Sequence, residues 1–108
     1  MKKGDNAEIT MQKTLCTGKV PDRAIYSCEL LKYDETCEYI YFLLKSGELT
    51  DLSLDAIYEC EIHSETESLN CTGKIRERYN SKEGKTLKIR IENGFYKINR
   101  NGVDKQMA

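Results

Sequence analysis

The sequence contains no tryptophan, one proline and one histidine among its 108 residues. It has no apolar run close to the roughly 18 residues of a membrane-spanning helix, since the longest run covers only 39–44. The first residues include two lysines but are followed by a polar stretch, without the apolar segment of a secretory signal. These absences predict a water-soluble protein without a membrane span, and we expect a cytoplasmic location.

The five cysteines form an odd set with no C-x-x-C pair. Neither a complete disulfide framework nor a zinc knuckle is therefore indicated. We expect most of these cysteines to be small buried hydrophobic side chains. A reactive thiol is the alternative, although no cysteine has a recognisable activating neighbour. The sequence predicts no cofactor and no metal site.

Residues for catalysis are also scarce. The single histidine, His63, falls at the end of a predicted strand beside a polar loop, and Cys60 lies three positions earlier, on the opposite face of that strand. Acid and base pairs are conceivable among neighbouring carboxylates, but solvated carboxylates are the simpler interpretation. These pairs are Asp51 with Asp55 and Glu59 with Glu61. No nucleotide-binding glycine loop or metalloprotease motif is present, so we predict that the chain is not an enzyme.

Apolar residues alternate at a spacing of two far more often than they recur at helical spacing. Strand-length segments rich in Ile, Leu, Tyr and Cys cover residues 9–13, 24–32, 39–45, 56–63, 70–79, 85–92 and 95–99. Six or seven strands predict an all-β fold, and we favour a closed antiparallel barrel because an open sheet would leave exposed edges. We expect one domain over 1–108 with its core in 9–99, flexible residues 1–7, a tail at 100–108 and room for a short terminal helix.

Turn residues separate these segments. Asn93-Gly94 predicts a type I′ turn, and Ser46-Gly47 separates two apolar runs as a hairpin turn would. Residues 63–70 and 80–84 suit longer hairpin loops, which makes the C-terminal half an antiparallel meander. Residues 87–91 alternate cleanly, with the leucine and isoleucines inward. Residues 39–44 are apolar on both faces, so their outer face needs a cover from a terminal helix, a loop or a second subunit.

Charge is distributed unevenly along a chain whose net charge is only -1. Acidic residues dominate residues 1–69 and basic residues dominate 70–108. A basic patch with neighbouring aromatic rings suits single-stranded nucleic acid. Its cations are Lys74, Arg76, Arg78, Lys88 and Arg90. Alternatively, cross-strand ion pairs with Glu59 and Glu61 consume part of this charge.

The segment Asp51-Leu52-Ser53-Leu54-Asp55-Ala56 leaves one strand and enters the next through short polar side chains. Such Asp and Ser side chains usually satisfy the amides of their own turn. At the mouth of a barrel, the same side chains are also able to hydrogen-bond a nucleotide or phosphate.

Over residues 19–98 the chain resembles the PilZ domain, a six-stranded antiparallel barrel whose better-known members bind cyclic di-GMP. The resemblance rests on residues 41–53, 71–78 and 87–91. Binding members of the family carry R-x-x-x-R before the barrel and D/N-x-S-x-x-G between strands. Here Asp51 and Ser53 match the second motif with Ala56 in place of glycine, and Lys19 and Arg23 stand where the first motif's arginines are expected.

The resemblance implies that Lys19, Arg23, Asp51 and Ser53 are the ligand-binding residues. A lysine cannot stack on a guanine or form the forked hydrogen bonds of a guanidinium. We therefore predict a bacterial regulatory or interaction domain that acts through a protein partner or self-association, with cyclic di-GMP binding weak or absent. A true cyclic di-GMP receptor and a nucleic-acid-binding barrel are the alternatives.

Overall fold

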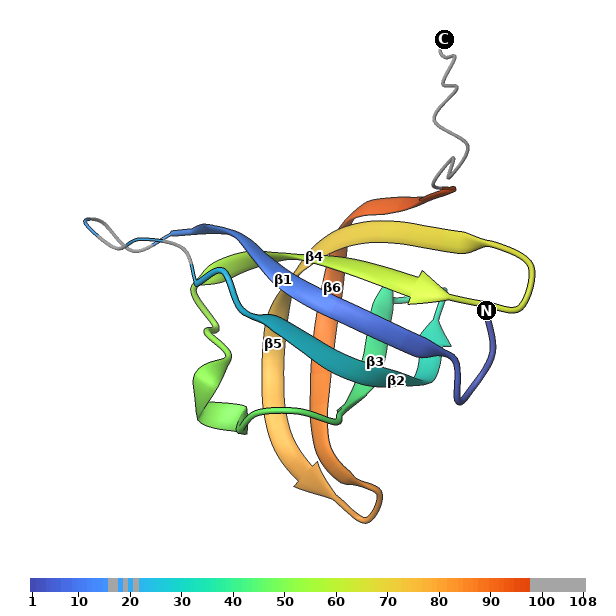
Figure 1. The fold of residues 1–108 in the computed structure, drawn as a ribbon, viewed down its shortest axis with the longest axis horizontal. Coiled ribbons are helices and arrows are strands. Elements are labelled where there is room, and N and C mark those ends of the chain that lie inside the picture. The colour runs from blue at the N-terminus through green and yellow to red at the C-terminus, as the bar shows by residue number, and fades with distance from the viewer. Residues whose placement is uncertain (16–17, 19, 21, 98–108) are drawn as a thin grey trace, which may run out of the picture.

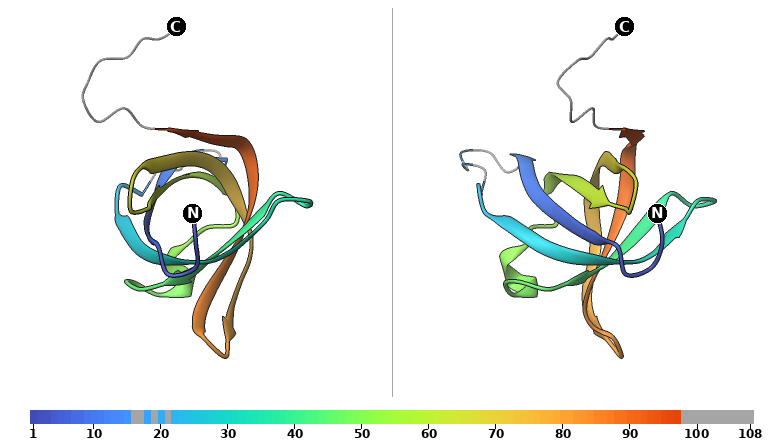
Figure 2. Two further views of the ribbon diagram at one scale, coloured as in Figure 1. Left: turned by 90° about the vertical axis from the view of Figure 1, so that its right-hand side faces the viewer. Right: turned by 45° about the vertical axis from the view of Figure 1, so that its right-hand side comes forward.

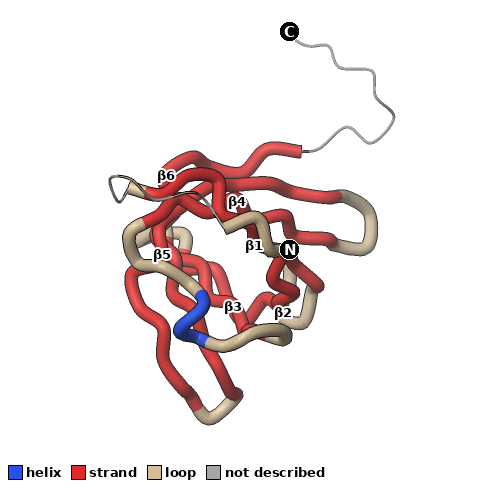
Figure 3. The backbone as a smooth tube through the Cα atoms, turned by 60° about the vertical axis from the view of Figure 1, so that its left-hand side comes forward, coloured by secondary structure: helices blue, strands red, loops and turns tan. Residues whose placement is uncertain are grey.

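The protein is an all-β barrel, as the alternating pattern predicted. A computed structural model describes residues 1–15, 18, 20 and 22–97. Its strands are β1 (Asn6–Thr14), β2 (Ile25–Asp34), β3 (Tyr39–Leu44), β4 (Ala56–His63), β5 (Ser68–Ser81) and β6 (Gly84–Lys97). One short 3₁₀ helix, η1 (Leu49–Asp51), lies between β3 and β4 and is the blue segment of Figure 3. Within these described residues, no helix is long and apolar enough to cross a membrane.

The six strands close into a ring in the order β1-β2-β3-β6-β5-β4 (Figure 1). Every neighbouring pair is antiparallel, and β4 returns to pair with β1 from Asn6↔His63 to Thr14↔Ala56. The left view of Figure 2 looks into this ring. Closure leaves the barrel without the unpaired edges of an open sheet, which removes a template for aggregation.

Alternation along the strands fills the interior. On β6, Leu87, Ile89 and Ile91 are at most 6% exposed, which confirms the prediction for residues 87–91. On β3, Ile40, Phe42 and Leu44 are buried in the same core. Successive side chains of a strand point to opposite faces, so these residues share one hydrophobic centre.

The outer face of β3 is covered differently from our expectation. Tyr39, Tyr41 and Leu43 are half-buried. The ammonium of Lys32 lies 4.8 Å from the ring centre of Tyr41, and that of Lys88 lies 4.3 Å from the ring centre of Tyr39. Long cationic side chains lay their alkyl stems over apolar surface and place their charge over aromatic rings. Neighbouring strands thus supply the cover. No terminal helix is present among the described residues, and residues 98–108 lie outside them.

The predicted Asn93-Gly94 turn is wrong. β6 runs without a break through both residues, and Gly94 does not have a positive φ. The register of β5 with β6 shifts here, from Thr72↔Asn93 to Asn70↔Tyr96, so β6 carries one extra residue as a bulge. Pairing along the long strand β5 overrides the local turn preference. Residues 85–92 and 95–97 therefore belong to one strand, and the predicted positions 98–99 lie outside the described residues.

Other turns have mixed outcomes. The β4–β5 and β5–β6 hairpins and the C-terminal meander form as predicted, but their turns, at 64–67 and 82–83, are shorter than the predicted loops. Gly47 has a φ of 84° and turns the chain, but β3 and β4 do not pair, so Ser46-Gly47 is not a hairpin turn. The chain instead crosses the end of the barrel through η1.

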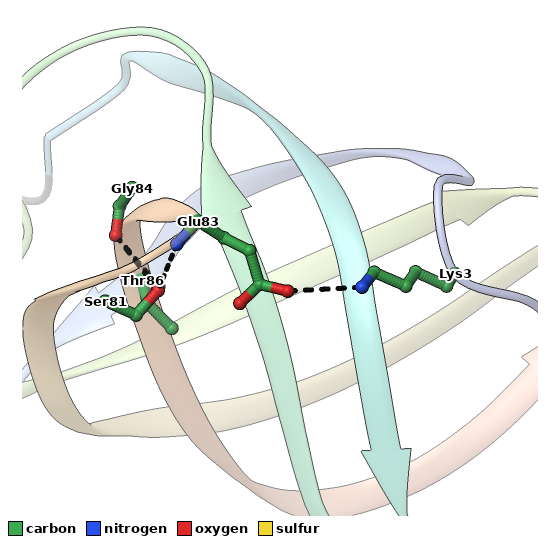
Figure 4. A network of polar contacts seen from close by, with 5 residues as sticks. All are labelled: Lys3, Ser81, Glu83, Gly84 and Thr86. Carbon is green, nitrogen blue, oxygen red and sulfur yellow. Dashed lines mark hydrogen bonds and ion pairs between the residues drawn. The ribbon is translucent and has the colours of Figure 1, made fainter.

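A polar network ties the N-terminal segment to the β5–β6 hairpin (Figure 4). The ammonium of Lys3 lies 3.1 Å from a carboxylate oxygen of Glu83, and the hydroxyl of Ser81 accepts a hydrogen bond from the amide of Glu83. The Ser81 and Thr86 hydroxyls are 2.8 Å apart. The exposed Lys3–Glu83 ion pair thus joins the start of the chain to this hairpin, while the other contacts of the network lie within the hairpin itself.

Three of the four described cysteines are core residues, as predicted. Cys28, Cys60 and Cys71 are buried, Cys37 is exposed, and Cys16 lies outside the described residues. Burial raises the pKa of the Cys28 thiol to about 12. A hydrogen bond with Cys71, followed by burial, raises the pKa of Cys60. Because the thiolate is the reactive form, these buried thiols are poor nucleophiles.

Candidate functional site

The loop from Lys45 to Asp55 crosses one end of the barrel and carries Asp51 and Ser53. The amide of Glu48 donates to the Asp51 carboxylate over 2.9 Å, and the amide of Asp51 donates back to the Glu48 carbonyl over 2.9 Å. The amide of Asp55 donates to the Ser53 hydroxyl over 3.0 Å. Both side chains therefore satisfy amides of their own loop, which confirms the turn interpretation of this segment.

The loop is anchored to the core on both sides of Ser53. The side chain of Leu52 is fully buried. The amide of Ser53 donates over 2.9 Å to the hydroxyl of Tyr58, itself a fully buried residue of β4. Buried tyrosines usually place their hydroxyl on such a partner. The polar positions of the loop are thus held rigidly over the barrel end.

The segment before β2 lies at the same end of the barrel (Figure 1). The hydroxyl of Tyr26 donates to the Asp22 carboxylate over 2.6 Å, and its ring packs against Gly47, where an added Cβ would lie 3.0 Å from the ring. The structure thus brings Arg23, which directly follows Asp22, to the end of the barrel that carries Asp51. Arg23 is exposed and forms no hydrogen bond or ion pair with another described residue, while Lys19 lies outside the described residues.

The Asp22–Tyr26 pair predicts a pH-dependent contribution to stability. Hydrogen bonds from Tyr26, and then from the amide of Ala24, lower the pKa of the Asp22 carboxyl. The same bond to Asp22 is the main reason that the pKa of Tyr26 is raised. Because the folded pKa of Asp22 lies below the unfolded value of about 3.9, this stabilisation is present above that value and is lost as pH falls through the folded pKa.

We therefore expect Tyr26→Phe to lower the free energy of unfolding more at pH 7 than at pH 2. Urea unfolding of both proteins at the two pH values measures the difference. An equal loss at both pH values would show that the hydroxyl does not act through the Asp22 carboxylate.

A hollow of about 330 Å³ lies over the loop, lined by residues 50–55 and Arg78. Its charged side chains are two carboxylates, Asp51 and Asp55, and one guanidinium. That guanidinium is engaged, since Arg78 donates to the backbone carbonyls of Leu49 and Leu52. The one cationic side chain that lines the hollow is therefore already hydrogen-bonded to the loop, and the two carboxylates would repel a phosphate.

The predicted basic patch is divided by a β-bulge. The β5–β6 register shifts between Ile75↔Ile89 and Glu77↔Lys88, so Arg76 is the extra residue on β5. Glu77 then lies opposite Lys88, 3.8 Å from its ammonium, and Arg78 is directed to the loop. A bulge re-aims the side chains that follow it. Of the five predicted cations, Arg78 is therefore turned to the loop and Lys88 lies beside a carboxylate.

Arg90 lies beside Lys88, since both cations are over the ring of Tyr39, at 5.9 Å and 4.3 Å from its centre. Lys74 and Arg90 are cross-strand partners, and Arg76 is exposed. Among the described residues, Arg76 and Arg78 do not form the expected ion pairs with Glu59 and Glu61, because β4 places these glutamates opposite Thr72 and Asn70, before the arginines. The amide nitrogen of Asn70 instead donates to Glu59 over 2.8 Å.

A second polar cluster was missed in the sequence. Glu8 of β1 and Glu61 and His63 of β4 place one ligand atom each within 4.8 Å of the others. Strand periodicity was a signal for Glu61 and His63, which share a face at a spacing of two. No local signal identified Glu8, because its position beside them depends on the pairing of β1 with β4 that closes the barrel.

Comparison of the chain with protein-family models, with curated proteins and with solved structures finds no match.

Proposed function

We propose that this barrel is a non-catalytic regulatory or interaction domain of the PilZ-like type, in which cyclic di-GMP binding is weak or absent. One observation carries the proposal: the polar side chains of the candidate loop are engaged with the loop itself, whereas apolar side chains around it are exposed. A nucleotide site needs the opposite distribution, with a few polar groups directed to the ligand.

Three side chains that a nucleotide would need are already hydrogen-bonded. Asp51 and Ser53 each accept a backbone amide, and Arg78 donates to two carbonyls. Binding an anion through Arg78 would compete with its bonds to the loop, of which the bond to the Leu49 carbonyl is exposed and the bond to the Leu52 carbonyl is partly buried. An unsatisfied buried polar group costs about 1–3 kcal/mol, which opposes binding.

The apolar rim of this barrel end consists of Leu15, Ile25 and Leu54, which are 49%, 64% and 41% exposed. Leu15 is held beside the loop, because its amide donates to the carbonyl of Asp55 over 2.8 Å. Ile25 begins β2 at the same end. Isolated exposed apolar residues are common, but their concentration at one end is typical of a surface for another protein or a second copy of the chain.

Calorimetric titration of the reduced protein with cyclic di-GMP tests the proposal. We expect no saturable binding tighter than about 100 µM, equivalent to about 5.5 kcal/mol. Arg23→Ala removes the exposed guanidinium of the candidate site, and Lys82→Ala is a matched loss of positive charge in the β5–β6 turn. Micromolar binding that Arg23→Ala abolishes and Lys82→Ala preserves would overturn the proposal in favour of a cyclic di-GMP receptor.

A further inference from the structure

We propose that Glu8, Glu61 and His63 bind a divalent transition-metal cation of the Zn²⁺ type on the outer face of the barrel, where β1 pairs with β4. The site is separate from the loop and the apolar rim, and it departs from the expectation of no metal site. Imidazole and carboxylate are ligands that Zn²⁺ takes in three-ligand protein sites, which leave a further position for water or substrate.

Strand geometry brings the three side chains together. Glu61 and His63 are two residues apart on β4 and face outward, while the intervening Ile62 is buried. Glu8 lies directly opposite Glu61 on β1. Directly opposite residues of an antiparallel pair have Cβ atoms about 4.5–5.5 Å apart. Two adjacent rigid strands therefore hold all three ligands.

The distances suit an intervening cation better than direct bonds. Nε2 of His63 lies 3.7 Å from an oxygen of Glu8, and Nδ1 lies 3.9 Å from an oxygen of Glu61. Both separations exceed the 2.7–3.2 Å range of a hydrogen bond. Ligand atoms around a tetrahedral Zn²⁺ with bonds of about 2.0–2.2 Å lie about 3.4 Å apart. One ring nitrogen of His63 binds the cation, so the relevant spacing is that among one ligand atom from each residue, and these atoms lie within 4.8 Å of one another. Side-chain movements that shorten these separations by up to about 1.4 Å would bring the three atoms into that geometry.

A neighbouring serine orients the imidazole. Nδ1 of His63 lies 3.3 Å from the hydroxyl of Ser68. In the tautomer with its proton on Nδ1, the ring donates to Ser68 and directs the lone pair of Nε2 toward Glu8. Metal-binding histidines commonly use their second nitrogen in this way, which fixes both tautomer and ring orientation.

An independent observation comes from the next strand. Asn70 lies directly opposite Glu61 on β5 and is 7% exposed. Its amide nitrogen donates to Glu59, but its buried carbonyl oxygen has no hydrogen-bond partner in the described part of the chain. Glu8, Glu61 and Asn70 thus form a row of oxygen-bearing side chains across three adjacent strands. A cation, or a water molecule bound to it, would satisfy this oxygen, because an amide oxygen is also a metal ligand.

The cluster is open to solvent. The side chains of His63, Glu8 and Glu61 are 36%, 49% and 25% exposed. Glu8 and His63 also line a hollow of about 390 Å³. A cation therefore has an entry path and room for a further ligand. The two carboxylates would balance the charge of a divalent cation beside a neutral imidazole.

The ring of His63 gives a direct readout, because it is the only histidine of the chain. We would titrate the protein with Zn²⁺ at pH 7.5 and follow the imidazole proton signals by NMR. We expect a saturable shift of these signals with one Zn²⁺ per chain. Mg²⁺ should produce no comparable shift, because it prefers oxygen ligands.

Matched variants test the carboxylate ligand. Glu8→Gln should weaken Zn²⁺ binding at least about tenfold, while Glu65→Gln, the same change at an exposed residue of the 64–67 turn, should leave it unchanged. Thermal unfolding of both variants checks that the barrel stays folded. The proposal is wrong if Zn²⁺ leaves the His63 signals unmoved, or if both variants bind Zn²⁺ as tightly as the original protein.

Discussion

Replacing Gly73 with alanine is expected to lower the free energy of unfolding by about 3 kcal/mol, the upper part of the range for overpacking. A Cβ at this position would lie 2.3 Å from the backbone oxygen of Arg90 and 2.8 Å from a methyl carbon of Ile89. The first clash is with backbone, so no side-chain rotation relieves it. β5 and β6 would have to separate at a point where the register already shifts.

Gly94 provides the matched control for Gly73. It lies in β6, has no positive φ, and an added Cβ would meet nothing within 4 Å. Gly94→Ala should therefore change the free energy of unfolding by at most about 0.5 kcal/mol. A small increase is expected because alanine lowers the conformational entropy of the unfolded chain. Urea unfolding of the two variants measures both effects. Equal losses would mean that strand propensity, and not the close approach of β5 to β6, makes glycine necessary at residue 73.

Replacing Leu52 with alanine should cost about 3 kcal/mol, within the 2–5 kcal/mol usual for a buried leucine. Leu52 lies between the two polar residues of the candidate site, and its side chain is fully buried in the core. The truncation would leave a cavity beneath the loop and weaken the support of the Ser53 amide, which donates to Tyr58. We also expect faster hydrogen exchange of that amide.

Leu54 is the natural comparison for Leu52. It stands two residues further along the same loop but is 41% exposed. Leu54→Ala should therefore change the free energy of unfolding by less than about 1 kcal/mol, as is usual for surface positions. Similar unfolding midpoints for the two alanine variants would contradict the role of Leu52 as the anchor of the loop.

Local patterns predicted the strands well because burial on one face leaves a period of two in the sequence. The alternation at Leu87, Ile89 and Ile91 is the clearest example. The same local information failed at Asn93-Gly94, where the turn preference of two residues competes with pairing along a 14-residue neighbour. Pairing between strands depends on residues distant in sequence, so Asn93-Gly94 alone did not indicate that the strand would continue instead of turning.

In the candidate sites too, features set by local sequence were predictable, and features set by strand pairing were not. The hydrogen bonds of Asp51 and Ser53 within their loop were predictable, because short polar side chains commonly satisfy turn amides. The direction of Arg78 was not predictable, since one extra residue at Arg76 changes which way the following side chains point. The meeting of Glu8 with His63 required the ring closure itself, which joins the first strand to the fourth.

That closure also bears on how the chain reaches its folded state. The β5–β6 hairpin is joined by a two-residue turn, whereas β1 must find β4 across most of the first half of the sequence. Long loops lose more entropy on closing, and folds dominated by distant pairings form more slowly. The C-terminal meander is thus able to assemble early, with the two distant pairings, β1 with β4 and β3 with β6, as later steps. A cation bound by Glu8 of β1 and by Glu61 and His63 of β4 would stabilise the pairing of these two strands and hence the closed barrel.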